Sequence, residues 1–224
     1  MERHEVINRL SANRYHSYLE IGVDFGTTFN QVNLARKVGV DPCFKVPVSQ
    51  LRGEAVSLPS DDFFRTNTER FDCVFIDGLH TYAQSKRDFL NAQSCLNPGG
   101  VVILDDCVPA DELSSLPDLD ECLRLRAASG APDDYTWMGD VYKTALWIND
   151  CTDFGLAFVE GTMGVVVIWS RPRPQPRRRW LADETAIANC PYAGFRSLSL
   201  PWRPLEWIAL QTAPRVSWWR KLVR

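Results

Sequence analysis

The sequence predicts an α/β protein built on a doubly wound, mostly parallel sheet of seven strands with helices on both faces. Two features of the first 170 residues predict this fold. Short apolar segments of strand length alternate with segments of helical length, and fully apolar strands suit a parallel sheet covered on both sides. Acids and glycines recur directly after the apolar segments, at the edge where open parallel sheets bind ligands.

The elements are expected in the following order along the chain. The helices are residues 1–17, 30–39, 81–96 and 139–149. The strands are residues 18–23, 38–40, 55–58, 71–76, 101–104, 154–159 and 164–170, and the last two suggest a hairpin. Gly39 ends the second helix, because glycine is the usual residue just past a helix C-terminus. Residues 97–100, Asn-Pro-Gly-Gly, form a turn before the fifth strand.

The length of 224 residues fits one α/β domain with an appendage. We expect residues 1–170 to form the domain and residues 171–224 to form a C-terminal extension rich in Pro, Arg and Trp. The extension begins with RPRPQPRRRW, a semi-rigid linker over residues 171–180. It carries 11 Lys and Arg and 3 Asp and Glu, a net charge of +8, and the overall charge of −3 leaves −11 for the domain.

This charge asymmetry favours an extension that folds back on the acidic domain. The segments Arg177–Trp180 and Trp218–Lys221 also suit an anionic glycan or a membrane surface. Nucleic acid is not an expected partner, because the sequence contains no recognised binding module. The oligomeric state stays open, and a homo-oligomer is among the states that the sequence allows.

Composition indicates the class and the compartment. Hydrophobic residues make up 45% of the chain, which is enough to bury a core. No run of 18 apolar residues is present and the N-terminus lacks a secretory signal, so neither a transmembrane segment nor secretion is expected. The seven cysteines are widely spread without a C-x-x-C pair, which indicates free, mostly buried thiols in a reducing cytoplasm.

A glycine-rich turn follows the first expected strand. Glu20, Gly22 and Gly26 form the pattern E-x-G-x-x-x-G-x-T, in which the glycines allow a ligand to approach the backbone closely. The following helix N-terminus presents free N–H groups. The segment IGVDFGTTFN also looks like the phosphate-binding hairpin of the actin and heat-shock-chaperone ATPases. That hairpin should continue as a strand, whereas NQVNLARKVG is helix-like and the chain is too short for their two-lobed fold.

Further acids follow the later strands. Asp41 lies 21 residues after Glu20, close to the spacing of the acid that takes ribose hydroxyls in nucleoside-binding domains. The chain continues with FIDGLHTY, LNPGG and VVILDD, and with WMGDVYK at residues 137–143. With these motifs in this order, residues 18–170 resemble class I S-adenosylmethionine-dependent methyltransferases of Rossmann-like fold. The subgroup is similar to catechol O-methyltransferase and to bacterial sugar O-methyltransferases.

The resemblance implies S-adenosylmethionine as cofactor and O-methylation of a small-molecule or sugar hydroxyl. The residues it implies for cofactor binding are Glu20, Gly22, Gly26, Thr28, Asp41 and Asp77. Asp61 or Asp62 is expected near the adenine. Asp24 departs from the pattern, which commonly has a small residue in the turn. Its carboxylate either repels the carboxylate of the cofactor or binds its ammonium group.

Three carboxylates are expected at the ends of two adjacent strands. In metal-dependent relatives, acids that match Asp77, Asp105 and Asp106 bind Mg²⁺, which makes Mg²⁺ a candidate cofactor here. His80 is the expected general base, assisted by Asp77, because imidazole has a suitable pKa. Leu79 stands where the sugar enzymes can place an acid. This departure and Asp24 leave open a second alternative, a degenerate methyltransferase fold that only binds its ligand.

Overall fold

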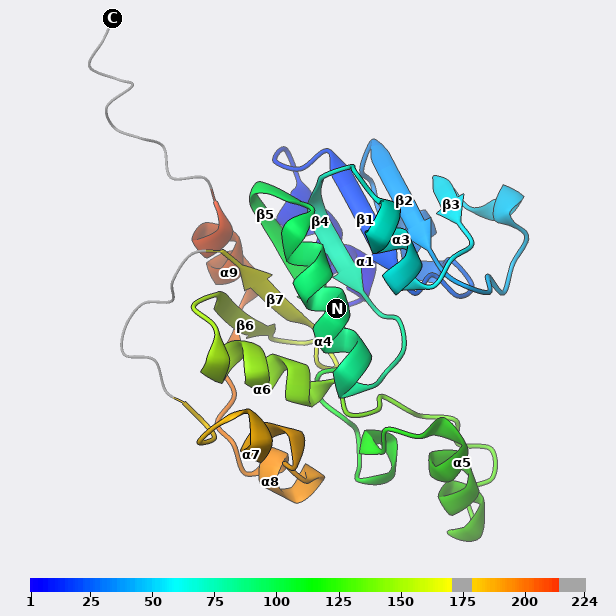
Figure 1. Ribbon diagram of the computed structural model, residues 1–224, viewed down its shortest axis with the longest axis vertical. Helices are drawn as coiled ribbons and strands as arrows, with labels where there is room; N and C mark the ends of the chain where they lie inside the picture. Colours follow the sequence, from blue (N-terminus) through cyan, green and yellow to red (C-terminus); the bar gives the residue numbers. More distant parts are fainter. Residues whose placement is uncertain (171–178, 214–224) are drawn as a thin grey trace, which may run out of the picture.

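The structure is a computed structural model, and it describes residues 1–170 and 179–213. Within these residues, eight strands form one sheet in the order β3-β2-β1-β4-β5-β7-β6-β8 (Figure 1). The strands are β1 (Ser17–Ile21), β2 (Arg36–Val40), β3 (Glu54–Val56), β4 (Phe71–Ile76), β5 (Leu96–Leu104), β6 (Gly155–Val159), β7 (Val166–Trp169) and β8 (Trp202–Arg203). The strands from β3 to β5 in this order are parallel, β7 is antiparallel to both of its neighbours, and β8 is parallel to β6. The expected fold class is confirmed, with eight strands instead of seven.

Helices cover both faces of this sheet (Figure 1). They are α1 (Arg3–Ser11), α2 (Thr27–Gln31), α3 (Ser60–Thr66), α4 (Tyr82–Ser94), α5 (Leu119–Ala128), α6 (Tyr142–Cys151), α7 (Glu184–Ala188), α8 (Tyr192–Arg196) and α9 (Leu205–Thr212), with 3-10 turns η1 (Val48–Gln50) and η2 (Leu113–Ser115). Successive side chains of β1 point to opposite faces: Tyr18 packs with α1, α2 and α9, and Leu19 packs with α3, α4 and α6. Two buried apolar layers therefore fix the sheet between the helices.

The predicted helix over residues 30–39 is wrong. Helix α2 ends at Gln31, and Gly39 lies inside β2. A Cβ atom at Gly39 would lie 2.9 Å from Val23 Cγ2 and 3.1 Å from Phe29 Cε2, so glycine is needed there for packing. The buried Lys37 donates from Nζ to the carbonyls of Phe29 and Val32 at 2.7 and 3.0 Å, and it satisfies the C-terminal end of α2 from the neighbouring strand.

The predicted turn at residues 97–100 belongs to β5. Phe71 of β4 pairs with Leu96, whereas Cys73 pairs with Val101, so the register shifts between these two pairs. The extra residues form an irregularity at the start of an otherwise buried strand. The apolar part of β5, residues 101–104, agrees with the prediction.

The C-terminal extension packs on the domain over its described residues 179–213. Strand β8 pairs with β6, and α9 packs on the sheet through Leu205 and Ile208. Asp150 at the end of α6 accepts hydrogen bonds from the backbone N–H groups of Trp180 and Leu181. The expected return of the extension to the domain is confirmed there, while residues 171–178 of the linker and Trp218–Lys221 lie outside the described residues.

An insertion between β5 and α6 forms a separate lobe around α5 (Figure 1). Its fixed point is Arg126, whose guanidinium is buried. Arg126 pairs with Asp111 at 3.0 Å and with Asp134 at 2.7 Å, and it donates to the carbonyl of Thr136 at 2.9 Å. This network closes the lobe and sets the path of residues 135–138 toward the sheet.

No helix in the described ranges 1–170 and 179–213 has the length and apolar character needed to cross a membrane. All seven cysteines are unpaired, and five of them are buried, as expected.

Candidate active site

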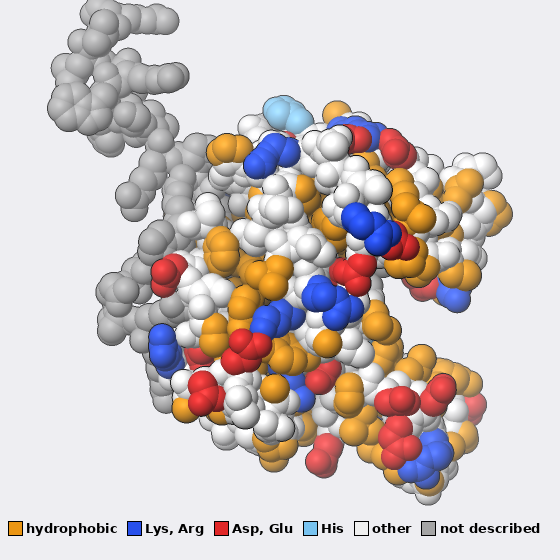
Figure 2. Space-filling model, in the orientation of Figure 1, with side chains coloured by type: hydrophobic (Ala, Val, Ile, Leu, Met, Phe, Trp, Pro, Cys, Tyr) orange, Lys and Arg blue, Asp and Glu red, His pale blue; other side chains and the backbone are white. Residues whose placement is uncertain are grey.

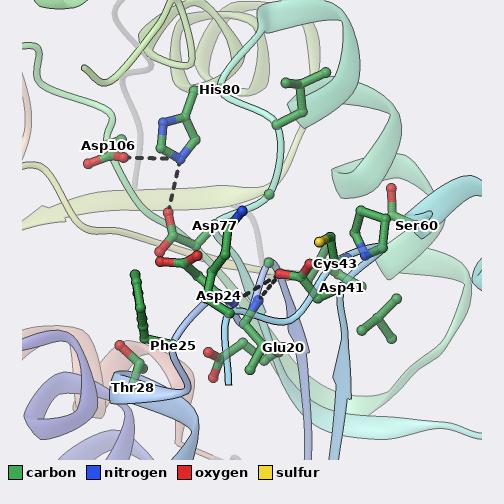
Figure 3. A pocket seen from close by; sticks show the side chains of 18 of the residues that line it. Glu20, Asp24, Phe25, Thr28, Asp41, Cys43, Ser60, Asp77, His80 and Asp106 are labelled. Atoms are coloured by element: carbon green, nitrogen blue, oxygen red, sulfur yellow. Dashed lines mark hydrogen bonds and ion pairs between the residues drawn. The ribbon is translucent and has the colours of Figure 1, made fainter. Parts of the chain in front are cut away.

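A cavity of about 930 Å³ opens at the carboxyl ends of β1, β2 and β4 (Figure 3). Its lining consists of Arg3 together with residues 20–25, 27–28, 40–43, 45, 59–61, 77–80, 84, 106 and 135–138. Figure 2 shows the molecule indented between the lobe of α5 and the body that carries β3 and α3, and residues from both sides line the cavity. The volume is that of a site for a small organic ligand.

The glycine turn after β1 forms the floor of the cavity. Gly22 has φ of 84°, and a Cβ atom there would lie 2.0 Å from the carbonyl oxygen of Asp77. Only glycine therefore allows the ends of β1 and β4 to approach this closely. Gly26 precedes α2 with φ of 74° but does not line the cavity, whereas Thr28 in the first turn of α2 does.

Asp41, directly after β2, holds this turn in place (Figure 3). Its Oδ2 accepts hydrogen bonds from the N–H groups of Val23 and Asp24, both at 2.9 Å, and its Oδ1 accepts one from Cys43 N at 2.7 Å. A carboxylate offers about four acceptor positions. Three are used by the backbone, which leaves one on Oδ1 for a ligand hydroxyl. Asp24 adopts the left-handed conformation, with φ of 50°, and its exposed side chain lines the cavity.

Glu20 is a buried acid in the wall of the cavity. The hydroxyl of Tyr18 donates to its Oε2 at 2.5 Å. Burial raises the pKa of Glu20 to about 8, although this hydrogen bond acts in the opposite direction. A cation inside the cavity would therefore favour the ionised form of Glu20.

His80 lies between two carboxylates at the other end of the cavity (Figure 3). Its Nε2 is 3.2 Å from Asp77 Oδ1 and 3.3 Å from Asp106 Oδ2. Burial lowers the pKa of His80, but the hydrogen bond with Asp77 and the nearby charges outweigh burial and raise it above its usual value. Its Nδ1 is buried without a hydrogen-bond partner, whereas its Nε2 faces the two carboxylates.

Two residues of the WMGDVYK motif fix the position of His80. The ring of Trp137 packs on the imidazole with a centroid distance of 5.0 Å. Gly139, with φ of 62°, passes so close that a Cβ atom would lie 1.6 Å from the carbonyl oxygen of His80. The motif therefore acts by contact with the base candidate, a role that the sequence did not assign to it.

Arg3, the first residue of α1, completes the acidic cluster. Its guanidinium forms an ion pair with Asp105 Oδ2 and lies 3.6 Å from Asp77 Oδ2 and 3.7 Å from Asp106 Oδ1. Burial and the neighbouring carboxylates raise the pKa values of Asp105 and Asp106, and the positive charges of Arg3 and His80 act in the opposite direction. No motif in the sequence had indicated Arg3.

The expected Mg²⁺ does not fit this cluster as it stands. Mg²⁺ requires nearly octahedral oxygen ligands at 2.0–2.1 Å. Both carboxylate oxygens of Asp77 and of Asp106 face either Arg3 or His80, and Asp105 is paired with Arg3. Asp77, His80 and Asp106 alone bring three donor atoms within 4.8 Å of one another, but this mixed nitrogen and oxygen set is less typical of Mg²⁺.

The structure thus brings most of the predicted residues into one cavity. The predicted residues that line the cavity are Glu20, Gly22, Thr28, Asp41, Asp77, His80 and Asp106. Gly26 and Asp105 do not line it. Of the two acids proposed near an adenine, Asp61 lines the cavity and Asp62 does not. Leu79 lies on its exposed rim together with Phe25 and Tyr135. The sequence had indicated Leu79 as a departure from the family pattern, whereas only their apolar character could have indicated Phe25 and Tyr135.

The topology excludes the phosphate-binding hairpin. Strands β1 and β2, which flank the IGVDFGTTFN segment, are parallel and are joined through α2. A hairpin would make them antiparallel. The alternative of an actin-type ATPase is therefore wrong.

Residues 19–107 match a family model described as a methyltransferase domain. No protein of curated function matches the sequence.

Several solved structures share the fold. A protein from Staphylococcus aureus assigned as a caffeoyl-CoA O-methyltransferase is 19% identical, with a TM-score of 0.54 over 75% of this chain and 83% of its own. The cofactor-bound protein Rv0187 from MTB is 16% identical, with a TM-score of 0.56 over 76% and 79%. A protein from Klebsiella pneumoniae assigned as an O-methyltransferase is 14% identical, with a TM-score of 0.55 over 75% and 79%. At these identities the likeness establishes the fold.

Proposed function

We infer that this chain is a class I S-adenosylmethionine-dependent methyltransferase, as its motifs predict, and that it methylates a hydroxyl oxygen of a small molecule or sugar. The match of residues 19–107 to a methyltransferase-domain model supports this inference. The observation that carries this proposal is the shared cavity. The glycine turn after β1 and the nitrogen of His80 line the same space. The names of two proteins of similar fold, both assigned as O-methyltransferases, support oxygen as the methylated atom.

The cofactor would occupy the part of the cavity that β1 and β2 form. When bound, S-adenosylmethionine supplies a methyl group on a positively charged sulfur, which an oxygen nucleophile can attack. Glu20 offers a buried carboxyl group to a cation, and Gly22 leaves the backbone open to close approach. Asp41 keeps one acceptor position for a ribose hydroxyl while it holds the turn. Thr28 of α2 lines this part of the cavity. Asp77 also lines the cavity and contacts His80, the proposed base.

His80 would act as the general base. The neutral imidazole would take the proton of the acceptor hydroxyl as the oxygen forms its bond to the methyl carbon, and the electron pair of the broken carbon–sulfur bond would stay on sulfur. Asp77 and Asp106 then stabilise the imidazolium that forms. Trp137 and Gly139 keep the imidazole from turning away.

The rim of the cavity supports a neutral acceptor with a flat face. Phe25, Leu79 and Tyr135 are 61%, 59% and 71% exposed and line the cavity, so apolar surface surrounds its opening. Such side chains pack against a phenol ring or a sugar face. The acids in the lining, Asp24 and Asp61 among them, outnumber the bases Arg3 and Lys45, which disfavours an anionic acceptor. The seven unpaired cysteines support the cytoplasm as the compartment.

Two measurements test this function. Calorimetric titration should detect binding of S-adenosylhomocysteine and none of ATP; binding of ATP alone would reject the proposal. Transfer of a tritiated methyl group should then be measured with a panel of neutral phenols and sugars. The His80→Gln variant should bind S-adenosylhomocysteine normally and lose transfer, and His16→Gln, which changes an exposed histidine outside the cavity, should retain both.

The same experiment separates an enzyme from a binding module. A degenerate fold would bind S-adenosylhomocysteine but transfer no methyl group to any acceptor. Transfer that is unaffected in His80→Gln would instead keep the methyltransferase and reject His80 as its base.

A further inference from the structure

Helix α1 delivers Arg3 to the acidic cluster from a fixed position. Val6, Ile7 and Leu10 of this helix are fully buried against the sheet. A capping box between Glu2 and Glu5 closes its N-terminus. The packing of the whole helix therefore fixes the backbone of Arg3, from which a side chain that is 43% exposed reaches the acids.

The guanidinium of Arg3 lies within ion-pair distance of all three acids. Its Nε pairs with Asp105, while its two terminal nitrogens lie 3.6 Å from Asp77 and 3.7 Å from Asp106. These are the acids at which the resemblance to metal-dependent relatives implied a metal ion. A guanidinium is planar, permanently charged and presents its donors in a fixed fork, which suits a fixed set of carboxylates.

The protein's own cations offset part of the negative charge of the cluster: Arg3, and His80 when it is protonated, face three carboxylates. Buried carboxylates require a positive partner or a proton. Arg3 supplies one positive charge, and His80 faces the remaining oxygens of Asp77 and Asp106. A divalent ion among the same oxygens would lie against the guanidinium and be repelled by it.

We propose that Arg3 is the built-in cation of this site, that it excludes divalent metal ions from the acids, and that methyl transfer here is independent of metal. The last part rests on the proposed function. Arg3 is a positioning residue in this scheme: it keeps Asp77 and Asp106 in place around His80. The expectation of Mg²⁺ is replaced by a cation from the protein itself.

The proposal predicts that removal of Arg3 creates a metal site. Binding of Mn²⁺ should be measured by calorimetry and by the loss of the free-ion electron paramagnetic resonance signal. The intact protein should bind Mn²⁺ no tighter than about 1 mM, the weak end of protein cation sites. Arg3→Met should bind it at least about tenfold tighter, because three carboxylates then lack their cation. Arg9→Met is the matched control, since Arg9 lies on the same helix and pairs with the exposed Glu206.

A double variant locates the new site. Asp105→Asn in the Arg3→Met background should lose the gained Mn²⁺ affinity, and Arg3→Lys should not gain it because the charge remains. Arg3→Lys also answers the question if Arg3→Met fails to fold, since tight Mn²⁺ binding by this variant would contradict the exclusion by charge. Methyl transfer by the intact protein should be unchanged by a chelator.

Opposite results would overturn the proposal. Micromolar Mn²⁺ binding by the intact protein, or activity abolished by a chelator and restored by metal, would show that Arg3 does not exclude the ion. The Mn²⁺ measurements do not depend on turnover. Failure of the proposed function would thus appear as absent methyl transfer with the metal results unchanged.

Discussion

Replacement of Asp41 by alanine tests how the cofactor turn is held. The substitution removes the acceptor of three backbone N–H groups, which belong to Val23, Asp24 and Cys43. Val23 is buried, so its N–H loses its partner without access to water, at a cost of about 2 kcal/mol. Asp24 and Cys43 are exposed and water can replace their bonds, at about 0.5 kcal/mol each. The expected loss of unfolding free energy is about 3 kcal/mol in total.

For a chain of this size, that loss lowers Tm by about 6–12 °C. Thermal unfolding followed by circular dichroism measures the shift, and calorimetry measures binding of S-adenosylhomocysteine below the transition, where the variant is folded. Binding should be abolished, because both the turn and the remaining acceptor of Asp41 are lost. Asp62→Ala, in a nearby helix but outside the cavity lining, is the control and should change neither property. A Tm within about 1 °C of the original, with binding intact, would refute the assignment of Asp41.

Three further predictions follow from the site and its supports. His80 must be unprotonated to act as a base and its pKa lies above its usual value, so kcat should rise with pH through that raised pKa and then level off. His80→Gln should lower kcat by about 10²–10⁴-fold and abolish this rise. A rate independent of pH in the intact enzyme would contradict the assignment of His80. Gly139→Ala should destabilise the fold by about 2 kcal/mol more than Gly130→Ala in chemical denaturation, since both glycines have positive φ but only Gly139 faces His80. Arg126→Met should raise KM for the acceptor and speed proteolysis of the α5 lobe, because the buried guanidinium joins Asp111, Asp134 and Thr136. Arg124→Met is the control and should change neither property, because it removes only an exposed pair with Glu121.

The central strands and the acids that follow them could be predicted because their signals are local. Strand β4 matches the expected residues 71–76, since every second position and most of the others are buried in one continuous apolar segment. Glu20, Asp41, Asp77 and Asp106 converge because parallel strands place their carboxyl ends at one edge. The position of each acid directly after a predicted parallel strand was enough to predict that they lie together.

What could not be predicted depends on contacts between distant segments. The segment over residues 30–39 has a helical pattern, but Lys37 satisfies the end of α2 from within β2, and Gly39 is required by Phe29. Arg3 precedes the glycine turn by a whole helix and belongs to no motif. Tyr135 lies in an insertion without periodicity, so its place on the cavity rim follows only from the lobe that Arg126 closes.

The extension contacts the helix that carries Arg3 and the turn that follows it, through two basic side chains of the domain. Arg9, near the end of α1, pairs with Glu206 of α9 at 2.5 Å, and Arg14, just after the helix, donates to the carbonyl of Thr212 at 2.6 Å. The extension therefore contacts the end of α1 mainly through Arg14, while Val6, Ile7 and Leu10 anchor the helix on the sheet. Residues 205–212 do not line the cavity, and they bear on it only through the helix whose first residue is Arg3. The extension thus supports the site by holding the helix from which Arg3 reaches the acids.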